Sequence, residues 1–467
     1  MNSKLQYTVP VLVVAGMFLI QADFVSSQSR ARDPGVRKDP AGAPPSAGGP
    51  IDGLTPKELE FFDLGREDFN EKEDVGDGLG PRMNLDGCGG CHSQPAIGGT
   101  SPALNPQVAF ANAASPSQLS EVDAFIKPKG PVREARFVQN PDGTPDGGVH
   151  ALFTITGREG ADNCRLDQED FDREIDRNNV IFRIPTPVFG AGLIEQIPDT
   201  TILANRGHSA TRKRDLGIHG HANFRVSGRT VSGQANKNGN DGTISRFGWK
   251  GQNQTLLLFS GEAYNVEMGI SSELFQVERD ETPSCQFADV PNDTQNFEAK
   301  NAHTGTTAIQ NFANFQRFLA PPRPSTYMPG GAESIRRGRT QFEKIECALC
   351  HTPTLRTGNS TVEALRYKDA NLFSDLLVHD MGPGLADGVS QGQAGPSEFR
   401  TSPLWGLGQR IFFLHDGRTA DLLEAIAAHQ SGSTRRGDAS EANEVIGKFN
   451  NLRDSEKQDL LNFLRSL

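Results

Sequence analysis

The chain has 467 residues and a formal net charge of −11, which argues against nucleic acids and anionic membrane surfaces as its main partners. With 36% hydrophobic and 22% charged residues it is not a disordered chain, and its length allows two or three packed domains. The 50 glycines and 29 prolines predict modest regular structure and long irregular segments.

The N-terminus is typical of a secretory signal peptide over residues 1–27. Lys4 precedes a short apolar core from Val9 to Ile20, and Val25 and Ser27 offer cleavage positions before Gln28. The alternative is a membrane anchor, but the apolar run is shorter than the roughly 18–20 residues of a spanning helix. We therefore expect a periplasmic or secreted protein without a stable membrane anchor. Residues 28–50 are rich in Pro, Gly and Ala and predict a flexible linker.

Ordered structure is expected to begin near Thr55, as the N-cap of a helix with Pro56 at its first position. Further along the chain, residues 93–180 predict short strands, residues 206–245 surface loops and hairpins, and residues 280–330 a loop-rich connection. Helices are expected over residues 255–264, 419–429 and 454–467.

Four of the six cysteines occupy two copies of one pattern, Cys88-Gly-Gly-Cys91-His92 and Cys347-Ala-Leu-Cys350-His351. Cys-x-x-Cys-His attaches c-type haem, because two thiols on a short turn add to one porphyrin edge while the adjacent His ligates the iron. A thioredoxin-like dithiol lacks its βαβ context here, and a zinc site that combines both pairs leaves the histidines unexplained. The sequence predicts two covalent c-type haems, with His92 and His351 as proximal ligands.

Two further histidines stand out on local grounds. His429 closes the helix expected over residues 419–429, on the face of Leu422 and Ala425, so it is either an iron ligand or a hydrogen-bonded core histidine. His415 lies in the tight turn His-Asp-Gly-Arg before that helix. It either lies beside the haem, bonding a propionate or the proximal side, or has a structural role in the turn.

The spacing Gly-x-x-x-Phe precedes both haem motifs, as Gly65 and Phe69 and again as Gly338 and Phe342. This repeat predicts a mainly α protein with extensive loops, built of two cytochrome c-like haem domains. The N-terminal domain, residues 51–330, carries large loop-rich insertions with short strands, and the C-terminal domain covers residues 331–467.

The chain resembles di-haem oxidoreductases of the thiol oxidoreductase-like family, relatives of the bacterial di-haem cytochrome c peroxidases. The resemblance covers most of residues 55–467 and rests on six stretches, which are residues 79–99, 182–194, 246–250 (Arg-Phe-Gly-Trp-Lys), 267–270 (Glu-Met-Gly-Ile), 379–383 (His-Asp-Met-Gly-Pro) and 399–408 running into 415–418. It implies a reactive N-terminal haem and a C-terminal haem that relays electrons.

The resemblance also implies site residues. The relatives hold the C-terminal iron with a Met where this chain has His429, and bis-histidine ligation lowers the potential. Glu267 matches their acidic residue near the reactive iron and is the candidate general acid/base, the alternative being a helix-end carboxylate in a salt bridge. His150 is a weaker candidate for their distal ligand or active-site base, the alternative being a surface histidine. Trp249 is either an electron stepping stone between the haems or a packed core aromatic.

Cys164 and Cys285 remain, as one disulfide or as two separate buried thiols. The acidic loop Glu71–Asp77 with Asp86 suggests calcium binding.

The resemblance implies a peroxidase-like enzyme that takes electrons from a small cytochrome or cupredoxin and acts on a small-molecule oxidant. An oxygenase of the polyisoprene-cleaving type and a non-catalytic multihaem electron carrier stay open as alternatives.

Overall fold

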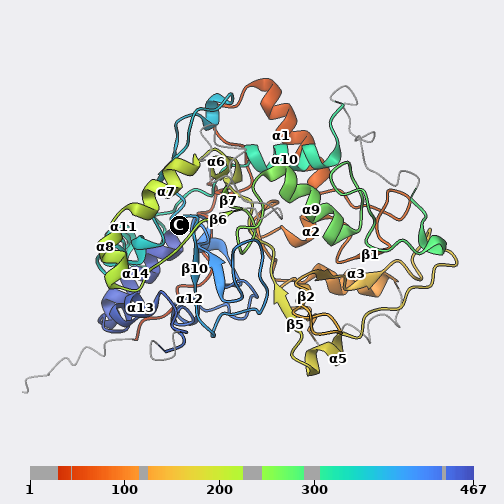
Figure 1. The fold of residues 1–467 in the computed structure, drawn as a ribbon. Helices are drawn as coiled ribbons and strands as arrows, with labels where there is room; N and C mark the ends of the chain where they lie inside the picture. The colour runs from red at the N-terminus through yellow and green to blue at the C-terminus, as the bar shows by residue number, and fades with distance from the viewer. Residues whose placement is uncertain (1–29, 44, 115–124, 225–243, 289–304, 434–437) are drawn as a thin grey trace, which may run out of the picture.

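The computed structural model describes residues 30–43, 45–114, 125–224, 244–288, 305–433 and 438–467 (Figure 1). Helices joined by long irregular segments form most of this part of the chain, and the strands are short, as the sequence predicted. The predicted signal peptide lies outside the described residues. Within them, no helix combines the length and the apolarity needed to cross a bilayer.

The α-helices in the N-terminal two thirds are α1 (Pro56–Phe69), α2 (Cys88–Cys91), α3 (Pro106–Ala114), α5 (Phe171–Asp176), α6 (Ala191–Glu195), α7 (Asp199–Gly207), α8 (Ala210–Asp215), α9 (Leu256–Met268) and α10 (Ala308–Phe318). Those in the remainder are α11 (Gly331–Lys344), α12 (Leu422–Ala427), α13 (Asn443–Asn450) and α14 (Asp454–Ser466). Short 3-10 turns are η1 (Pro283–Cys285), η2 (Cys347–Leu349), η3 (Glu363–Leu365) and η4 (Leu407–Gln409).

All strand pairs are antiparallel. The three-stranded sheet has the order β3-β2-β5, from β3 (Val149–His150), β2 (Glu134–Phe137) and β5 (Val180–Arg183), and Ala135 faces both His150 and Phe182 in it. The two-stranded pairs are β1 (Arg82–Met83) with β4 (Phe153–Thr154), β6 (Asn223–Phe224) with β7 (Ile244–Ser245), β8 (Leu355–Arg356) with β9 (Asp369–Ala370), and β10 (Val378–Asp380) with β11 (Glu398–Arg400).

The repeated Gly-x-x-x-Phe spacing corresponds to a repeated helix packing. A Cβ on Gly65 of α1 would lie 2.2 Å from the Asn311 carbonyl oxygen of α10, and a Cβ on Gly338 of α11 would lie 1.9 Å from the Asp459 carbonyl oxygen of α14. Only glycine allows backbones to approach so closely. The pairs α1/α10 and α11/α14 therefore have equivalent contacts, and Figure 1 shows the first pair at the top of the molecule and the second at its left.

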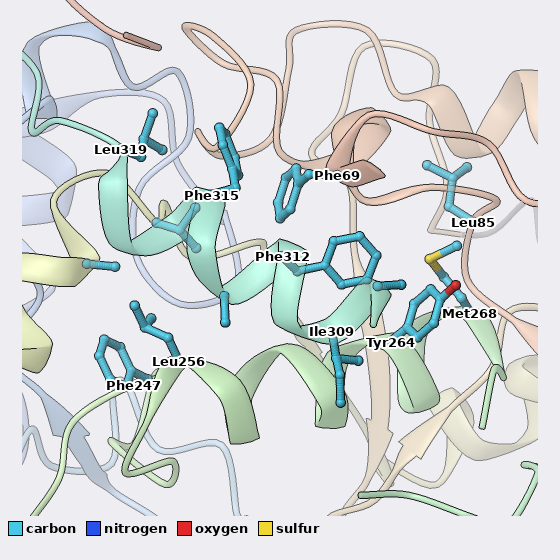
Figure 2. Close-up of a cluster of buried hydrophobic side chains, with 14 of the residues drawn as sticks. Phe69, Leu85, Phe247, Leu256, Tyr264, Met268, Ile309, Phe312, Phe315 and Leu319 are labelled. Carbon is cyan, nitrogen blue, oxygen red and sulfur yellow. The ribbon is translucent and has the colours of Figure 1, made fainter. Parts of the chain in front are cut away.

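The larger hydrophobic core lies between α1, α9 and α10. Figure 2 shows Phe312 and Phe315 of α10 facing Phe69 of α1, with Leu256 and Tyr264 of α9 below them. A Thr55 capping box begins α1 and Thr307 begins α10 in the same way, which fixes where both helices start. A second core joins α11, α12 and α14 around Phe342 and Phe463.

Three expectations about the chain's course need correction. Residues 30–50 are not a free linker: the buried Arg465 side chain of α14 pairs with Asp33, and the Arg37 amide donates to the Gly408 carbonyl at 2.7 Å. Part of residues 206–245 forms the end of α7 and α8 instead of loops. The connection 280–330 contains α10, whose buried face carries Ile309, Phe312 and Phe315 at helical spacing together with polar Asn311 and Gln316.

Candidate functional site

The first Cys-x-x-Cys-His pattern lies in a cavity that encloses about 1130 Å³. Cys88 and Cys91 are the ends of the single-turn helix α2, so both thiols and His92 line the same wall. Burial raises the pKa of the Cys88 thiol to about 12 and that of Cys91 well above its usual value. A redox dithiol needs the opposite shift, so the dithiol reading of this motif is not supported.

The hydrogen bonding of His92 leaves its Nε2 atom available to ligate a metal. Its Nδ1–H donates to the Gly99 carbonyl at 2.9 Å, which leaves Nε2 with the lone pair. Burial lowers the pKa of His92 to about 4, so the ring is neutral at physiological pH. The Phe69 ring stands edge-on to the imidazole at 5.8 Å. His92 is the only histidine among the residues that line this cavity in the described part of the chain.

A carboxyl pair also lines this cavity. Glu267, near the C-terminal end of α9, accepts a 2.7 Å hydrogen bond from the Asn84 side-chain amide and shares a hydrogen bond with Glu134 of β2. Burial and the neighbouring Glu134 carboxylate raise the pKa of Glu267 well above its usual value. Burial alone would raise the pKa of Glu134 too, but the Arg136 guanidinium, 2.6 Å away, brings it to about 2. Glu267 therefore holds the proton of this pair.

His150 is not part of this cavity. Its two ring nitrogens bond to Asp146 Oδ2 at 2.8 Å and Glu169 Oε2 at 2.6 Å, and its ring stacks on Phe137 at 3.7 Å. With both nitrogens bonded to carboxylates, the imidazole has no lone pair free for a metal or a substrate proton. The structure therefore gives no support to His150 as a distal ligand or base, and it has the environment of a structural histidine.

The second pattern lies in a separate cavity of about 1470 Å³, lined by Cys347, Cys350 and His351 and by α12, α13 and α14. The two cysteine pairs therefore line different cavities, which rules out one zinc site that combines them. In the described residues, the one group of at least three close metal-ligating side chains is Cys350, Asp375 and His379, and this group includes a predicted haem-attachment cysteine.

Two histidines line the second cavity, and their rings have equivalent hydrogen bonding. His351 Nδ1–H donates to the Phe373 carbonyl at 3.0 Å, and His429 Nδ1–H donates to the Ala425 carbonyl at 2.8 Å. Each keeps Nε2 free for a metal. Burial lowers the pKa of both, that of His351 to about 4, and the proximity of His429 contributes to this shift. The predicted helix 419–429 is shorter in the structure: Asp421 caps the start of α12, and α12 ends at Ala427, two residues before His429.

A family model described as "Di-haem oxidoreductase, putative peroxidase" matches residues 140–467, which is most of the chain. The protein belongs to this di-haem oxidoreductase family. No curated protein sequence matches the chain.

Three solved structures are similar over part of the chain. The di-haem peroxidase BthA from Burkholderia thailandensis is 16% identical with a TM-score of 0.29, over 47% of this chain and 65% of its own. Kuenenia stuttgartiensis hydrazine synthase is 17% identical with a TM-score of 0.26, over 61% of this chain and 88% of its own. A MauG-like protein associated with microbial copper homeostasis is 18% identical with a TM-score of 0.29, over 61% of this chain and 90% of its own.

In this di-haem oxidoreductase, Trp249 lines both cavities. Its indole N–H donates to the Ile184 carbonyl at 2.8 Å, and the Ile184 amide donates to the His415 carbonyl at 2.8 Å. The His415 ring lies edge-on to Trp249 at 6.4 Å and stacks on Phe399 at 4.4 Å. Burial lowers the pKa of His415 to about 4, so a neutral imidazole and an indole stand between the two predicted haem sites.

No sequence pattern indicated a role for Asn84, Glu134 and Arg136, although all three line the first cavity. A local signal existed for two of them. Glu134 and Arg136 are two residues apart on a strand, so they share one face of the sheet and pair with each other. Their approach to Glu267, more than 130 residues further along the chain, depends on tertiary packing and has no local signal.

Outside the two cavities, Cys164 and Cys285 form a disulfide, which confirms one of the two readings of these cysteines. In the acidic loop, the Asp74 carboxylate accepts backbone N–H groups of Gly76 and Asp77, and Asp86 pairs with Lys72 at 3.1 Å. Calcium binding there stays a prediction.

Proposed function

We propose that this chain is an exported di-haem peroxidase with one c-type haem in each cavity, the first reactive and the second a bis-histidine electron relay. The difference between the cavities carries the proposal. The first cavity offers one imidazole, that of His92, and a protonated carboxyl group. The second cavity offers two imidazoles, those of His351 and His429. One axial ligand leaves an iron open to small oxidants, and two strong ligands restrict it to electron transfer.

The residues present fit the cofactor. Each cavity has two free thiols on one wall, and each proximal histidine has its Nδ1 engaged by a carbonyl. A haem bound in each would supply an iron that exchanges electrons and, in the first cavity, takes an exogenous ligand. Covalent attachment through Cys88, Cys91, Cys347 and Cys350 is part of the proposal.

Glu267 is the proposed general acid/base. Reduction of hydrogen peroxide to two waters consumes two electrons and two protons, and the O–O bond breaks only if the leaving oxygen is protonated. Glu267 holds a proton in the first cavity, and Asn84 fixes the orientation of its carboxyl group. Glu134, ionised beside Arg136, keeps that proton on Glu267 and accepts its hydrogen bond. A water-borne proton then restores the pair after each transfer.

Trp249 is the proposed intermediate between the cavities, since it lines both and its indole is fixed by the Ile184 carbonyl. Electrons would arrive at the second haem from a small cytochrome or cupredoxin. The acidic charge of the chain favours a basic donor, because opposite charges accelerate encounter. Export rests on the N-terminal leader.

The test is spectroscopy on the purified holoprotein. A pyridine haemochrome assay should give two c-type haems per chain, and electron paramagnetic resonance should show one high-spin or ligand-binding haem and one low-spin haem. Peroxide should be consumed only with an electron donor. Two low-spin haems that are inert to peroxide and carbon monoxide in every redox state would establish an electron carrier instead. Consumption of dioxygen without peroxide turnover would establish the oxygenase alternative. Mass spectrometry of the mature chain should place its first residue at Gln28.

A further inference from the structure

Two buried arginines line the second cavity without a carboxylate partner. Arg400 ends β11 and Arg410 follows η4, and both side chains are more than nine-tenths buried. In the described part of the chain, the Arg410 guanidinium makes one hydrogen bond, to the Pro403 carbonyl at 3.3 Å. Arg400 donates to the carbonyls of Gly248 at 3.0 Å and Thr401 at 3.3 Å. The remaining N–H groups of both side chains need acceptors.

Four other buried arginines pair with carboxylates, whereas the buried Arg37 donates to the Arg323 carbonyl at 3.1 Å. Arg183 pairs with Asp387 at 2.7 Å and Arg136 with Glu134 at 2.6 Å, while Arg246 and Arg465 contact Asp199 and Asp33. An unpaired buried charge is strongly destabilising, so proteins rarely retain one without a counter-charge. Burial lowers the pKa of Arg400 and Arg410 to about 10 each, and the Arg410 charge adds to the shift of Arg400.

Among the residues that the structure describes, no carboxylate forms an ion pair with either arginine. Asp375 is the acidic group that acts on Arg400, but its two oxygens already bond to His379 Nε2 and to the Leu377 amide, both at 3.0 Å. His415, the residue predicted to bond a propionate, is buried and neutral and supplies no positive charge. A third cavity of about 500 Å³, lined by both arginines and by Trp249, adjoins this position.

We propose that Arg400 and Arg410 bind the two propionate carboxylates of the haem in the second cavity and hold them ionised. This inference rests on the proposed function, because it needs a haem in that cavity. Two guanidinium groups match two carboxylates in charge, and guanidinium–carboxylate pairs are bidentate and strong when buried. Trp249 also lines the cavities that both arginines line, so the propionate-binding position would lie beside the residue that the two haem cavities share.

The experiment measures the midpoint potential of each haem from pH 5 to 9 in the wild-type holoprotein and in Arg400→Met and Arg410→Met. In the wild type, ionised propionates should leave the potential of the second haem nearly independent of pH. In each variant, the ratio of oxidised to reduced second haem at a fixed potential should rise about tenfold at pH 8 and return toward the wild-type ratio as the released propionate takes up a proton. Arg410→Lys should restore much of the wild-type behaviour.

Arg82→Met is the matched control, because Arg82 pairs with Asp280 outside both cavities. It should leave both potentials unchanged. The inference is overturned if Arg400→Met and Arg410→Met fold with two haems and the second haem titrates as in the wild type. Fewer than two covalent haems in the wild-type chain would instead refute the proposed function, so the two failures are distinguishable.

If the methionine variants do not accumulate, the inference can be tested on the wild-type protein. Haem labelled with ¹³C at its carboxyl groups should show only ionised carboxylate bands for the second haem in redox-difference infrared spectra at neutral pH. A labelled band of a protonated carboxyl group on that haem would contradict the inference.

Discussion

The Glu134–Glu267 pair shows how one residue's chemistry is set by another. Both carboxyl groups are buried, yet the pKa of one is raised and that of the other is lowered, because only Glu134 has an arginine partner. Two carboxyl groups in contact cannot both ionise at low cost, so Arg136 decides which of them keeps the proton. Arg183 and Glu262 add further charges around the same pair.

Replacing Glu267 by Gln should lower peroxide turnover by roughly 10²- to 10⁴-fold, since an amide keeps the hydrogen bonds but transfers no proton. The wild-type rate should fall as pH rises through the raised pKa of Glu267, because the protonated form is the active one. Steady-state rates from pH 5 to 10 test both points. Glu278→Gln is the control, because the pKa of Glu278 is also raised, to about 7, but it lies outside the cavity. Unchanged turnover in Glu267→Gln would exclude the proposed role.

Replacing His429 by Met should raise the potential of the second haem by a sizeable part of the roughly 0.8 V over which axial ligands set haem potentials. Thioether ligation favours the ferrous state relative to imidazole, and His429 lies far from the first cavity's lining. Spectroelectrochemical titration should show one potential moved and the other retained. If neither potential moves, His429 is not a ligand.

At the scale of elements, the segment that carries Trp249 is held by Lys250. This side chain is fully buried, donates to the carbonyls of Gly395 at 2.9 Å and Glu398 at 2.8 Å, and contacts Asp387 Oδ1 at 3.1 Å. Burial lowers the pKa of Lys250 to about 8 despite that carboxylate. Keeping the Lys250 ammonium charged between β7 and the loop that leads to β11 therefore lowers the free energy of unfolding.

The lowered pKa of Lys250 makes the free energy of unfolding depend on pH. A folded-state pKa of about 8 against an ordinary value of 10.5 disfavours folding below pH 8, and the penalty is relieved as pH rises toward 10.5. The free energy of unfolding of the wild type, relative to Lys250→Met, should thus increase by about 3 kcal/mol between pH 8 and 10.5. Urea titrations across that range measure it. The exposed Lys57→Met on α1 should show no such divergence, and parallel pH curves for the wild type and Lys250→Met would contradict the assignment.

Local sequence signals predicted a good part of these elements. The Thr55 N-cap and α1, the amphipathic α14 and the two haem motifs depend on residues within a few turns of each other, so the sequence is sufficient to place them. The helix α10 was not predicted, although Ile309, Phe312 and Phe315 recur at helical spacing, and its buried Asn311 bonds Asp68 of α1 at 2.8 Å. Contacts between distant segments, such as Glu134 with Glu267, arise only when the whole chain has folded.

At the scale of the whole molecule, residues 30–50 tie the two halves together. Asp33 pairs with Arg465 of α14 and accepts the Leu422 amide at 2.9 Å, while the Ala320 amide, just after α10, donates to the Gly49 carbonyl at 3.0 Å. The segment thus contacts both helix groups, and the expected division at residue 330 does not separate it from either.

Replacing Asp33 by Ala should destabilise the protein by about 3–5 kcal/mol, because it leaves the buried Arg465 guanidinium without its counter-charge. The Asp33 pKa lies below its usual value, so this stabilisation is present at neutral pH and is lost as pH falls through the lowered pKa. Urea-induced unfolding at pH 7 and pH 3 measures both. Glu333→Ala, which breaks an exposed pair with Arg336, should change little. Equal effects of the two substitutions on the free energy of unfolding would show that the Asp33–Arg465 pair does not stabilise the protein.

The same segment also sets the order of folding. The Arg32 amide bonds the Gln458 side chain across 426 positions, so residues synthesised near the start of the chain find their partners only when α14 exists. Contacts of such large sequence separation form late and slow the final step. The second cavity, which α14 lines through Leu460 and Leu464, is therefore complete only after the last helix docks.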